Sequence, residues 1–184
     1  AELGRDHALA LSLWETGNID AMMLSALTLE PEKLDRAQAE RMISDAKYFD
    51  LLDELVFDAI AEAPFAPEMR DEWMKAPDDL KGRIGWMLVV SGIMSKAYDT
   101  EALSHIVDLV EAGLKDAPPL TQEMMNRALC ENGIRYEGFT ARCVEIGERL
   151  GVYKDQKVPK GCTSAYAPDW IAAGIRLRQA RKRR

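Results

Sequence analysis

The chain has 184 residues, of which 47% are hydrophobic and 30% are charged, with three cysteines and a formal net charge of −7. This composition excludes a disordered or collagen-like chain, and a chain of this length can bury a stable core without disulfides. The sequence contains no apolar run of about 18 residues, so we expect no contact with a membrane through a spanning helix.

The cysteines Cys130, Cys143 and Cys162 are odd in number and lack CxxC spacing. This pattern argues against a disulfide framework and against a zinc site, and we expect no metal and no cofactor. A reducing cytoplasm is the expected location. The sequence begins at Ala1 without an initiator methionine or an apolar leader, so we expect further residues upstream.

The charge is distributed unevenly along the chain. Residues 176–184 hold six of the 24 lysines and arginines and no acid. The first 175 residues therefore carry 18 cations against 31 acids, a formal charge of −13. An acidic body disfavours nucleic-acid binding, which depends on clustered cations at phosphates. The basic C-terminal tail over 176–184 is either a solvated helix end, where the helix dipole favours cations, or a local phosphate-contacting strip.

Apolar residues recur at helical spacing along the chain, with no strand-like alternation. Asn18 caps one expected helix, Pro31 follows its end, and Gly133 marks the end of another. The expected helices cover residues 6–15, 18–29, 34–45, 48–63, 68–75, 80–98, 100–115, 121–132, 139–150 and 168 onward. About ten helices in pairs spaced about 30 to 45 residues apart are typical of an all-α HEAT- or armadillo-like superhelix. We expect residues 1–184 to form one such domain; a globular helical bundle is the alternative.

Motifs of several enzyme classes are absent from the sequence. The two histidines, His7 and His105, do not lie beside a serine or cysteine nucleophile motif. Glycine-rich phosphate loops, HExxH and EF-hand loops are also absent. Any chemistry must therefore come from a few dispersed side chains.

The segment 47–55 carries the strongest candidates. Phe49 and Asp53 are four residues apart and share a helix face, flanked by Tyr48 and Asp50. Arg83, near the start of the long helix 80–98, is expected to face this segment across a concave surface. The alternative is an ordinary helix start, with Phe49 in the core, Asp53 in solvent and Arg83 in a surface ion pair.

Several runs of the sequence resemble, in the same order, the AlkD-like family of DNA alkylation repair proteins. These runs are residues 11–21 (LSLWETGNIDA), 45–53 (DAKYFDLLD), 81–84 (KGRI) and 125–129 (MNRAL). The closing run 158–171 (VPKGCTSAYAPDWI) resembles a C-terminal signature of one bacterial branch of that family. The resemblance implies a HEAT-like superhelix, and the family's usual extra N-terminal helices are not evident in this sequence.

The resemblance also implies a function: a monofunctional DNA glycosylase that removes cationic N3- or N7-alkylated purines from duplex DNA held in the concave groove. Asp53 takes the position of the family's carboxylate, which stabilises the developing oxocarbenium charge and positions a water molecule. Arg83 matches the family's phosphate-contacting arginine. The lesion is expected to stay outside a base pocket, unlike in glycosylases that flip the base.

The sequence departs from the family pattern at two aromatic positions, where Phe49 and Arg127 replace tryptophans. Arg127 could bind phosphate instead, and Trp86 could replace part of the lost aromatic wall unless it is a core residue. Tyr48, Phe49, Arg83, Trp86 and Arg127 are thus the expected DNA contacts. The alternative function is a noncatalytic HEAT-like module that binds protein or DNA.

Overall fold

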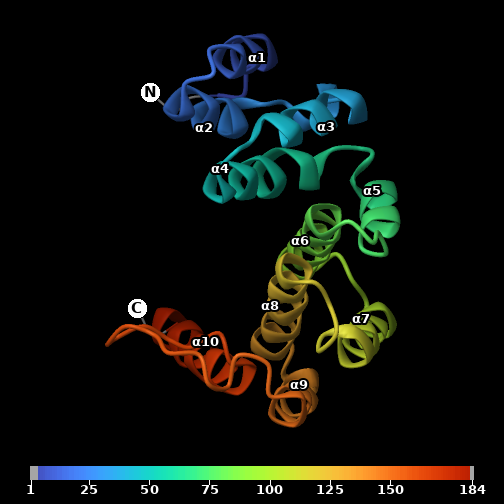
Figure 1. The fold of residues 1–184 in the computed structure, drawn as a ribbon, viewed down its shortest axis with the longest axis vertical. Helices are drawn as coiled ribbons and strands as arrows, with labels where there is room; N and C mark the ends of the chain where they lie inside the picture. Colours follow the sequence, from blue (N-terminus) through green and yellow to red (C-terminus); the bar gives the residue numbers. More distant parts are fainter. Residues whose placement is uncertain (1–3, 183–184) are drawn as a thin grey trace. The chain divides into compact units, whose positions relative to one another are not determined.

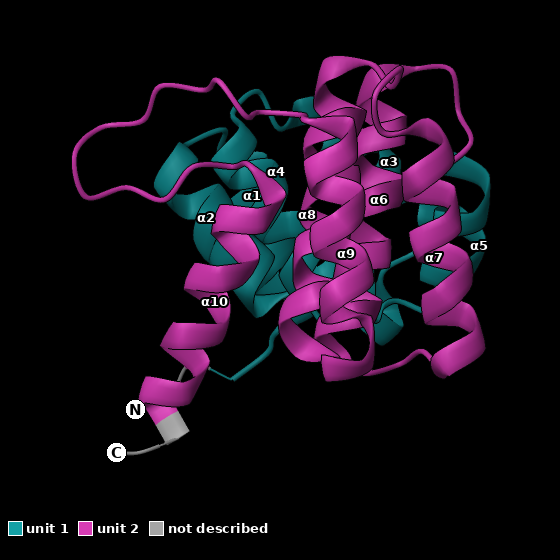
Figure 2. Cartoon of the chain, turned by 90° about the horizontal axis from the view of Figure 1, so that it is seen from below, with its two compact units in different colours: residues 1–73 teal, residues 74–184 magenta. Residues whose placement is uncertain are grey.

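The computed structural model describes residues 4–182 (Figure 1). Ten α helices and no strand form within this range, which confirms the all-α class expected from the sequence. The chain divides into two compact units, residues 1–73 and 74–184, shown in different colours in Figure 2. The single domain over 1–184 stays a prediction, and the two units are described separately below.

The first unit contains five α helices and three short turns of helix. The α helices are α1 (His7–Glu15), α2 (Ile19–Thr28), α3 (Arg36–Asp45), α4 (Phe49–Glu54) and α5 (Ala66–Trp73). The short turns are η1 (Pro31–Lys33), η2 (Leu55–Ala59) and η3 (Ile60–Glu62). Helix α2 packs against α1, α4 and η2, so that its apolar face covers the core side of α4. Leu29, Leu51, Leu55 and Ile60 are fully buried in this core.

The helix starts in the first unit follow from capping side chains. Asn18 Oδ1 accepts a hydrogen bond from the Ala21 amide at 3.1 Å and so caps α2, as the sequence predicts. Asp35 caps α3 through the Gln38 amide at 2.7 Å, and Gln38 bonds back to the Asp35 amide in a capping box.

The helix predicted over 48–63 is not regular. It is an α helix only to Glu54, then widens to a π turn over Leu55–Ala59 and tightens to a 3-10 turn over Ile60–Glu62. A π turn accommodates one extra residue, which hydrophobic periodicity does not reveal. Leu55, Val56 and Ala59 are buried along this irregular stretch, so packing stabilises it.

The second unit is built around two long helices. Its five helices are α6 (Asp79–Ser95), α7 (Thr100–Gly113), α8 (Pro119–Arg135), α9 (Glu137–Leu150) and α10 (Ala167–Lys182). Helix α6 is buried continuously from Gly82 to Val90 and packs along α8. Helices α7 and α9 also pack against α8, while α10 lies against α8 and α9 (Figure 2). The continuous burial of α6 agrees with its apolar sequence, whereas α8 is the helix that contacts the other four.

Helix α8 continues beyond the end that Gly133 predicts and reaches Arg135. A Cβ atom at Gly133 would lie 2.9 Å from Ile171 Cδ1 and 3.0 Å from Cys143 Cβ. The glycine therefore permits close packing of α9 and α10 against α8 and does not terminate the helix. The prediction of an end at Asn132 was wrong for this reason.

The C-terminal part of the chain is helical over the first residues of the predicted basic tail. Helix α10 includes Arg176 through Lys182, and Arg183 and Arg184 lie outside the described residues. Among the helices of residues 4–182, none combines the length and apolar character needed to cross a bilayer.

Candidate nucleic-acid site

Helix α4 presents one apolar face to the core and one face with the predicted site residues. Leu51 and Leu52 are buried on the first face. Phe49 is 50% exposed and Tyr48, the residue before the helix, is 57% exposed. Asp53 lies half-buried one turn after Phe49. The aromatic ring and the carboxylate therefore occupy the same side of the helix, as the sequence predicts.

Three carboxyl groups cluster where α4 widens. Glu54 and Asp58 share a hydrogen bond between their side chains, which raises the pKa of Glu54. Burial and the negative charges of Asp58 and Asp53 raise this pKa further. Glu54 thus holds a proton more readily than an ordinary glutamate.

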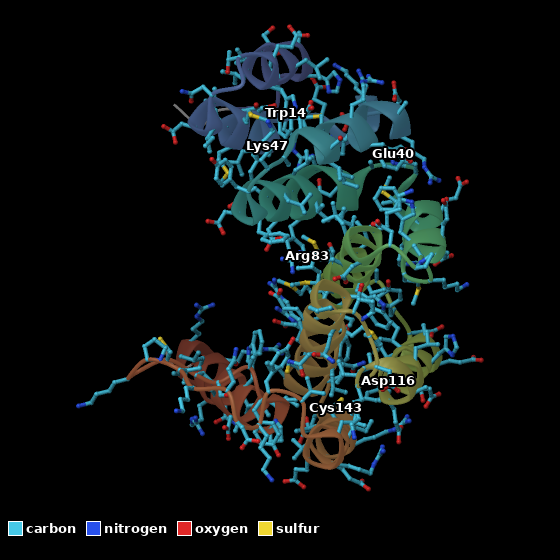
Figure 3. The ribbon with its side chains drawn as sticks, in the orientation of Figure 1. Trp14, Glu40, Lys47, Arg83, Asp116 and Cys143 are labelled. Atoms are coloured by element: carbon cyan, nitrogen blue, oxygen red, sulfur yellow. The ribbon has the colours of Figure 1, made fainter. Side chains whose placement is uncertain are left out.

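A cavity of about 370 Å³ lies beside the start of α4. Its wall includes Trp14, Asp45, Lys47 and Tyr48; Trp14 and Lys47 are labelled in Figure 3. Trp14 Nε1 donates a hydrogen bond to Asp45 Oδ2 at 3.3 Å, which ties α1 to the end of α3. Of these lining residues, only Tyr48 is a DNA contact predicted from the sequence, although Trp14, Asp45 and Lys47 also lie in the runs that resemble the family.

In the second unit, Arg83 is held against α8. Its side chain is 3% exposed, and Nη1 lies 2.7 Å from Oε2 of Glu123. Gly82 permits this close packing, because a Cβ atom there would lie 2.2 Å from Thr121 Oγ1. Arg83 is therefore a buried ion-pair partner rather than the surface one that the alternative interpretation expected.

Arg127 follows Glu123 by one turn on α8 and is half-buried. The same helix thus carries the carboxylate that pairs with Arg83 and a second arginine. Trp86, one turn after Arg83, is 3% exposed. Its burial favours the core role over contact with DNA, because a ring without exposed surface cannot stack on a nucleotide.

The segment between α9 and α10 folds back onto α8. Asn126, which is buried, donates a hydrogen bond from Nδ2 to the Ala165 carbonyl at 2.8 Å. Tyr153 adopts a left-handed backbone with φ of 63°. Burial raises the pKa of Tyr153, and the charge of Glu123 raises it further. Tyr153 therefore interacts electrostatically with Glu123, the partner of Arg83, which sequence spacing did not indicate.

The predicted residues thus form two groups, each within one unit. Tyr48, Phe49 and Asp53 lie together at α4, and Arg83 and Arg127 lie at the α6–α8 contact. Their roles in DNA binding stay predictions. Over residues 4–182, no group of three or more histidine, cysteine, aspartate or glutamate side chains has an arrangement that could hold a metal ion.

Comparisons with known proteins place this arrangement in context. A curated protein of Listeria innocua, the uncharacterized protein Lin0241, is 24% identical over 174 residues, which cover 93% of this chain and 74% of that protein. A solved structure is 22% identical with a TM-score of 0.74, covering 99% of this chain and 77% of that one. It is described as a new family of proteins related to the HEAT-like repeat DNA glycosylases with affinity for branched DNA structures.

This structural likeness shows that the fold is HEAT-like, as the helix pairs of the sequence predict. The family model of the DNA alkylation repair enzymes matches residues 1–171. Because the match covers nearly the whole sequence, the chain belongs to the DNA alkylation repair enzyme family.

Proposed function

We propose that this protein is a DNA glycosylase that hydrolyses the N-glycosidic bond of cationic N3- or N7-alkylated purines in duplex DNA. The observation that carries the proposal is the half-buried carboxylate of Asp53, one turn after the exposed ring of Phe49, in a chain of the DNA alkylation repair enzyme family. A reducing, cytoplasmic location belongs to the same proposal and is supported by the three free thiols.

The chemistry requires little beyond a carboxylate. An alkylated purine already carries a positive charge and leaves as a neutral base, so no strong acid is needed. As the bond breaks, positive charge develops on the deoxyribose, and an anionic carboxylate stabilises that charge more strongly in the transition state than in the ground state. In the proposal, Asp53 supplies this charge and orients the attacking water, while Phe49 and Tyr48 contact the sugar and backbone.

The arginines of the second unit would bind phosphates of the damaged strand. Arg127 is half-buried on α8 and presents a guanidinium suited to bidentate phosphate contact. The Arg83 side chain is almost fully buried, and its positive charge is balanced by Glu123, whose Oε2 lies 2.7 Å from Arg83 Nη1. A phosphate would therefore compete with Glu123 for Arg83. Arg127 has more exposed surface than Arg83, which is 3% exposed.

A noncatalytic DNA-binding function is the second candidate. It is favoured by the replacement of two family tryptophans by Phe49 and Arg127, which reduces the aromatic wall expected beside the sugar but leaves an arginine that can bind phosphate. The solved relative described with affinity for branched DNA supports the same candidate, which would retain DNA binding without base excision.

Release of free bases separates the two candidates. Duplex DNA treated with a methylating agent is incubated with the full chain, and the liberated methylated purines are measured by chromatography. We expect release by the wild type, a fall of about 100-fold for Asp53→Asn, and less than about a twofold change for Asp50→Asn. Asp50 is a matched control because it is an exposed aspartate on the same helix.

Absence of release by the wild type, with no difference for Asp53→Asn, would contradict the glycosylase proposal. In that case, the affinities for a four-way junction and for a linear duplex of equal length are compared in the same buffer. Tighter binding of the junction would support the noncatalytic candidate, whereas absence of binding to both would exclude it.

A further inference from the structure

Helix α10 carries a basic strip, which we define as Arg176, Arg178 and Arg181. No acid follows Asp169 in the sequence, whereas the body before the tail has a formal charge of −13. Arg176 and Arg181 are exposed and Arg178 is half-buried. The strip is thus a local concentration of positive charge on an acidic protein.

One arginine of the strip is held in position by the neighbouring helix. Arg178 Nη1 donates a hydrogen bond to the backbone carbonyl of Ile134, near the end of α8, at 2.9 Å. This bond limits the conformations of the side chain, so less entropy is lost when its guanidinium binds a ligand. Arg178 is therefore preorganised rather than freely solvated.

A cavity of about 420 Å³ adjoins this anchored arginine. Its wall includes Arg135, Thr140, Arg178 and Gln179, together with the single carboxylate of Glu137. The Arg135 guanidinium is paired with Glu131, whose Oε2 lies 2.5 Å from Arg135 Nε, while the Arg178 guanidinium, a hydroxyl and an amide border one cavity. These are the side chains that bind phosphate oxygens in nucleic-acid complexes.

The helix dipole does not account for the whole strip. Its effect on cations falls off within the last turn, which contains Arg181 but neither Arg176 nor Arg178. Arg178 and Arg181 are three residues apart and lie on the same side of α10, so their charges repel each other. A bound polyanion would relieve this repulsion.

We propose that the basic strip of α10 binds the sugar–phosphate backbone of DNA, as a contact separate from Asp53, Arg83 and Arg127. Several arginines on one helix suit a chain of phosphates better than a single anion, because each neutralised phosphate releases counterions. The inference shares with the proposed function only its DNA partner and does not depend on base excision.

The salt dependence of DNA binding tests this proposal. Binding of the full chain to a fluorescent linear duplex is measured by anisotropy over a range of salt concentrations. For Arg176→Gln with Arg181→Gln, we expect affinity at low salt to fall by about tenfold and the slope of log K against log salt to become shallower by about 1.8, or about 0.9 for each lost phosphate contact. Arg176→Lys with Arg181→Lys should keep most of the slope, because lysine retains the charge.

Lys75→Gln with Lys115→Gln is the matched control, because it removes two exposed positive charges elsewhere in the second unit. Equal slopes for this control and for the α10 glutamine variant would overturn the proposal. Binding of the wild type to anionic phospholipid vesicles but not to the duplex would overturn it as well. Circular dichroism verifies that each variant is folded.

The outcomes also separate this proposal from the proposed function. If the α10 glutamine variant shows a shallower slope of log K against log salt and the wild type releases no base, only the glycosylase proposal is refuted. Base release that depends on Asp53, with an unchanged slope in the α10 variant, would refute the basic strip alone.

Discussion

Asp79 on α6 holds Thr121 at the start of α8 through its carboxylate. Oδ1 accepts one hydrogen bond from the Thr121 amide at 2.8 Å and another from Thr121 Oγ1 at 2.9 Å. Oδ2 accepts a third from the Leu120 amide at 3.1 Å. The residue before α8, Pro118, provides no side-chain cap, so Asp79 caps this helix from a neighbouring one. This contact fixes α6 and α8 beside the Arg83–Glu123 pair.

We expect Asp79→Asn to lower the free energy of unfolding by about 1 to 2 kcal/mol at neutral pH, the usual effect of a lost cap or charged hydrogen bond. Asp116→Asn, at an exposed turn, is the control and should change stability by less than about 0.5 kcal/mol. Urea unfolding followed by circular dichroism measures both. Equal stabilities of the two variants would contradict the capping role.

The stability difference between the wild type and Asp79→Asn should also depend on pH. Burial of Asp79 opposes its ionisation, but hydrogen bonds from Thr121 and Leu120, assisted by the charge of Arg83, lower its pKa below the ordinary 3.8. A depressed pKa contributes stability above about pH 3.8 that is lost as the pH falls through the folded-state value. The difference between wild type and Asp79→Asn should therefore shrink below that pH. A stability difference between the wild type and Asp79→Asn that stays constant down to pH 2 would contradict the lowered pKa of Asp79.

Gly82→Ala should destabilise the second unit. The added Cβ would lie 2.2 Å from Thr121 Oγ1, which cannot move without disturbing its bonds to Asp79. We expect a loss of about 1 to 3 kcal/mol, typical of overpacking. Gly138→Ala is the control, because no atom lies within 4 Å of its added Cβ. Thermal unfolding of both variants checks the prediction, and a destabilised Gly138→Ala with a normal Gly82→Ala would contradict it.

Glu123→Gln should strengthen DNA binding. The substitution removes one negative charge at 2.7 Å from Arg83 and one turn from Arg127. A gain of about 1 kcal/mol, or about fivefold in affinity at low salt, is expected from an exposed charge of this kind. Glu101→Gln, an exposed glutamate on α7, is the charge-matched control. Weaker binding by Glu123→Gln would indicate that Glu123 positions Arg83 for the phosphate rather than competing with it.

Glu54→Gln should stabilise the first unit at neutral pH. The raised pKa of Glu54 means that folding favours its protonated form, so its ionised form costs stability as the pH rises above the ordinary value of 4.5. Glutamine removes the repulsion with Asp58, an effect of about 0.5 kcal/mol for like charges four residues apart on a helix. The gain should be present at pH 7 and vanish below pH 4.5, as measured by thermal unfolding at both pH values. An equal gain in stability at both pH values would show that the Glu54–Asp58 pair is not its cause.

The sequence predicts helix existence and helix starts well, because both depend on local signals. Asn18 is an example, since its side chain caps the helix that immediately follows it. The end of α8 was mispredicted because Gly133 serves packing against Ile171, a residue distant in the chain. The π turn after Glu54 escaped prediction for a related reason: the buried residues around it, rather than any local motif, stabilise the extra residue.

The candidate site was only partly accessible from the sequence. The shared face of Phe49 and Asp53 follows from their four-residue spacing. The pairing of Arg83 with Glu123, 40 residues apart, depends on the packing of α6 against α8 and could not be read from spacing. Tyr153 could not be predicted from the sequence, because its electrostatic interaction with Glu123 depends on how the segment after α9 folds.

The π turn at Leu55–Ala59 also determines which side of the helix the next residues occupy relative to α4. If the same residues formed a regular α helix without the π turn, Ile60 would be rotated by about 100° relative to Asp53. Ile60, which is fully buried, would then point away from the apolar core. The irregular turn therefore allows the buried side of the helix and its carboxyl-bearing side to coexist in one continuous segment.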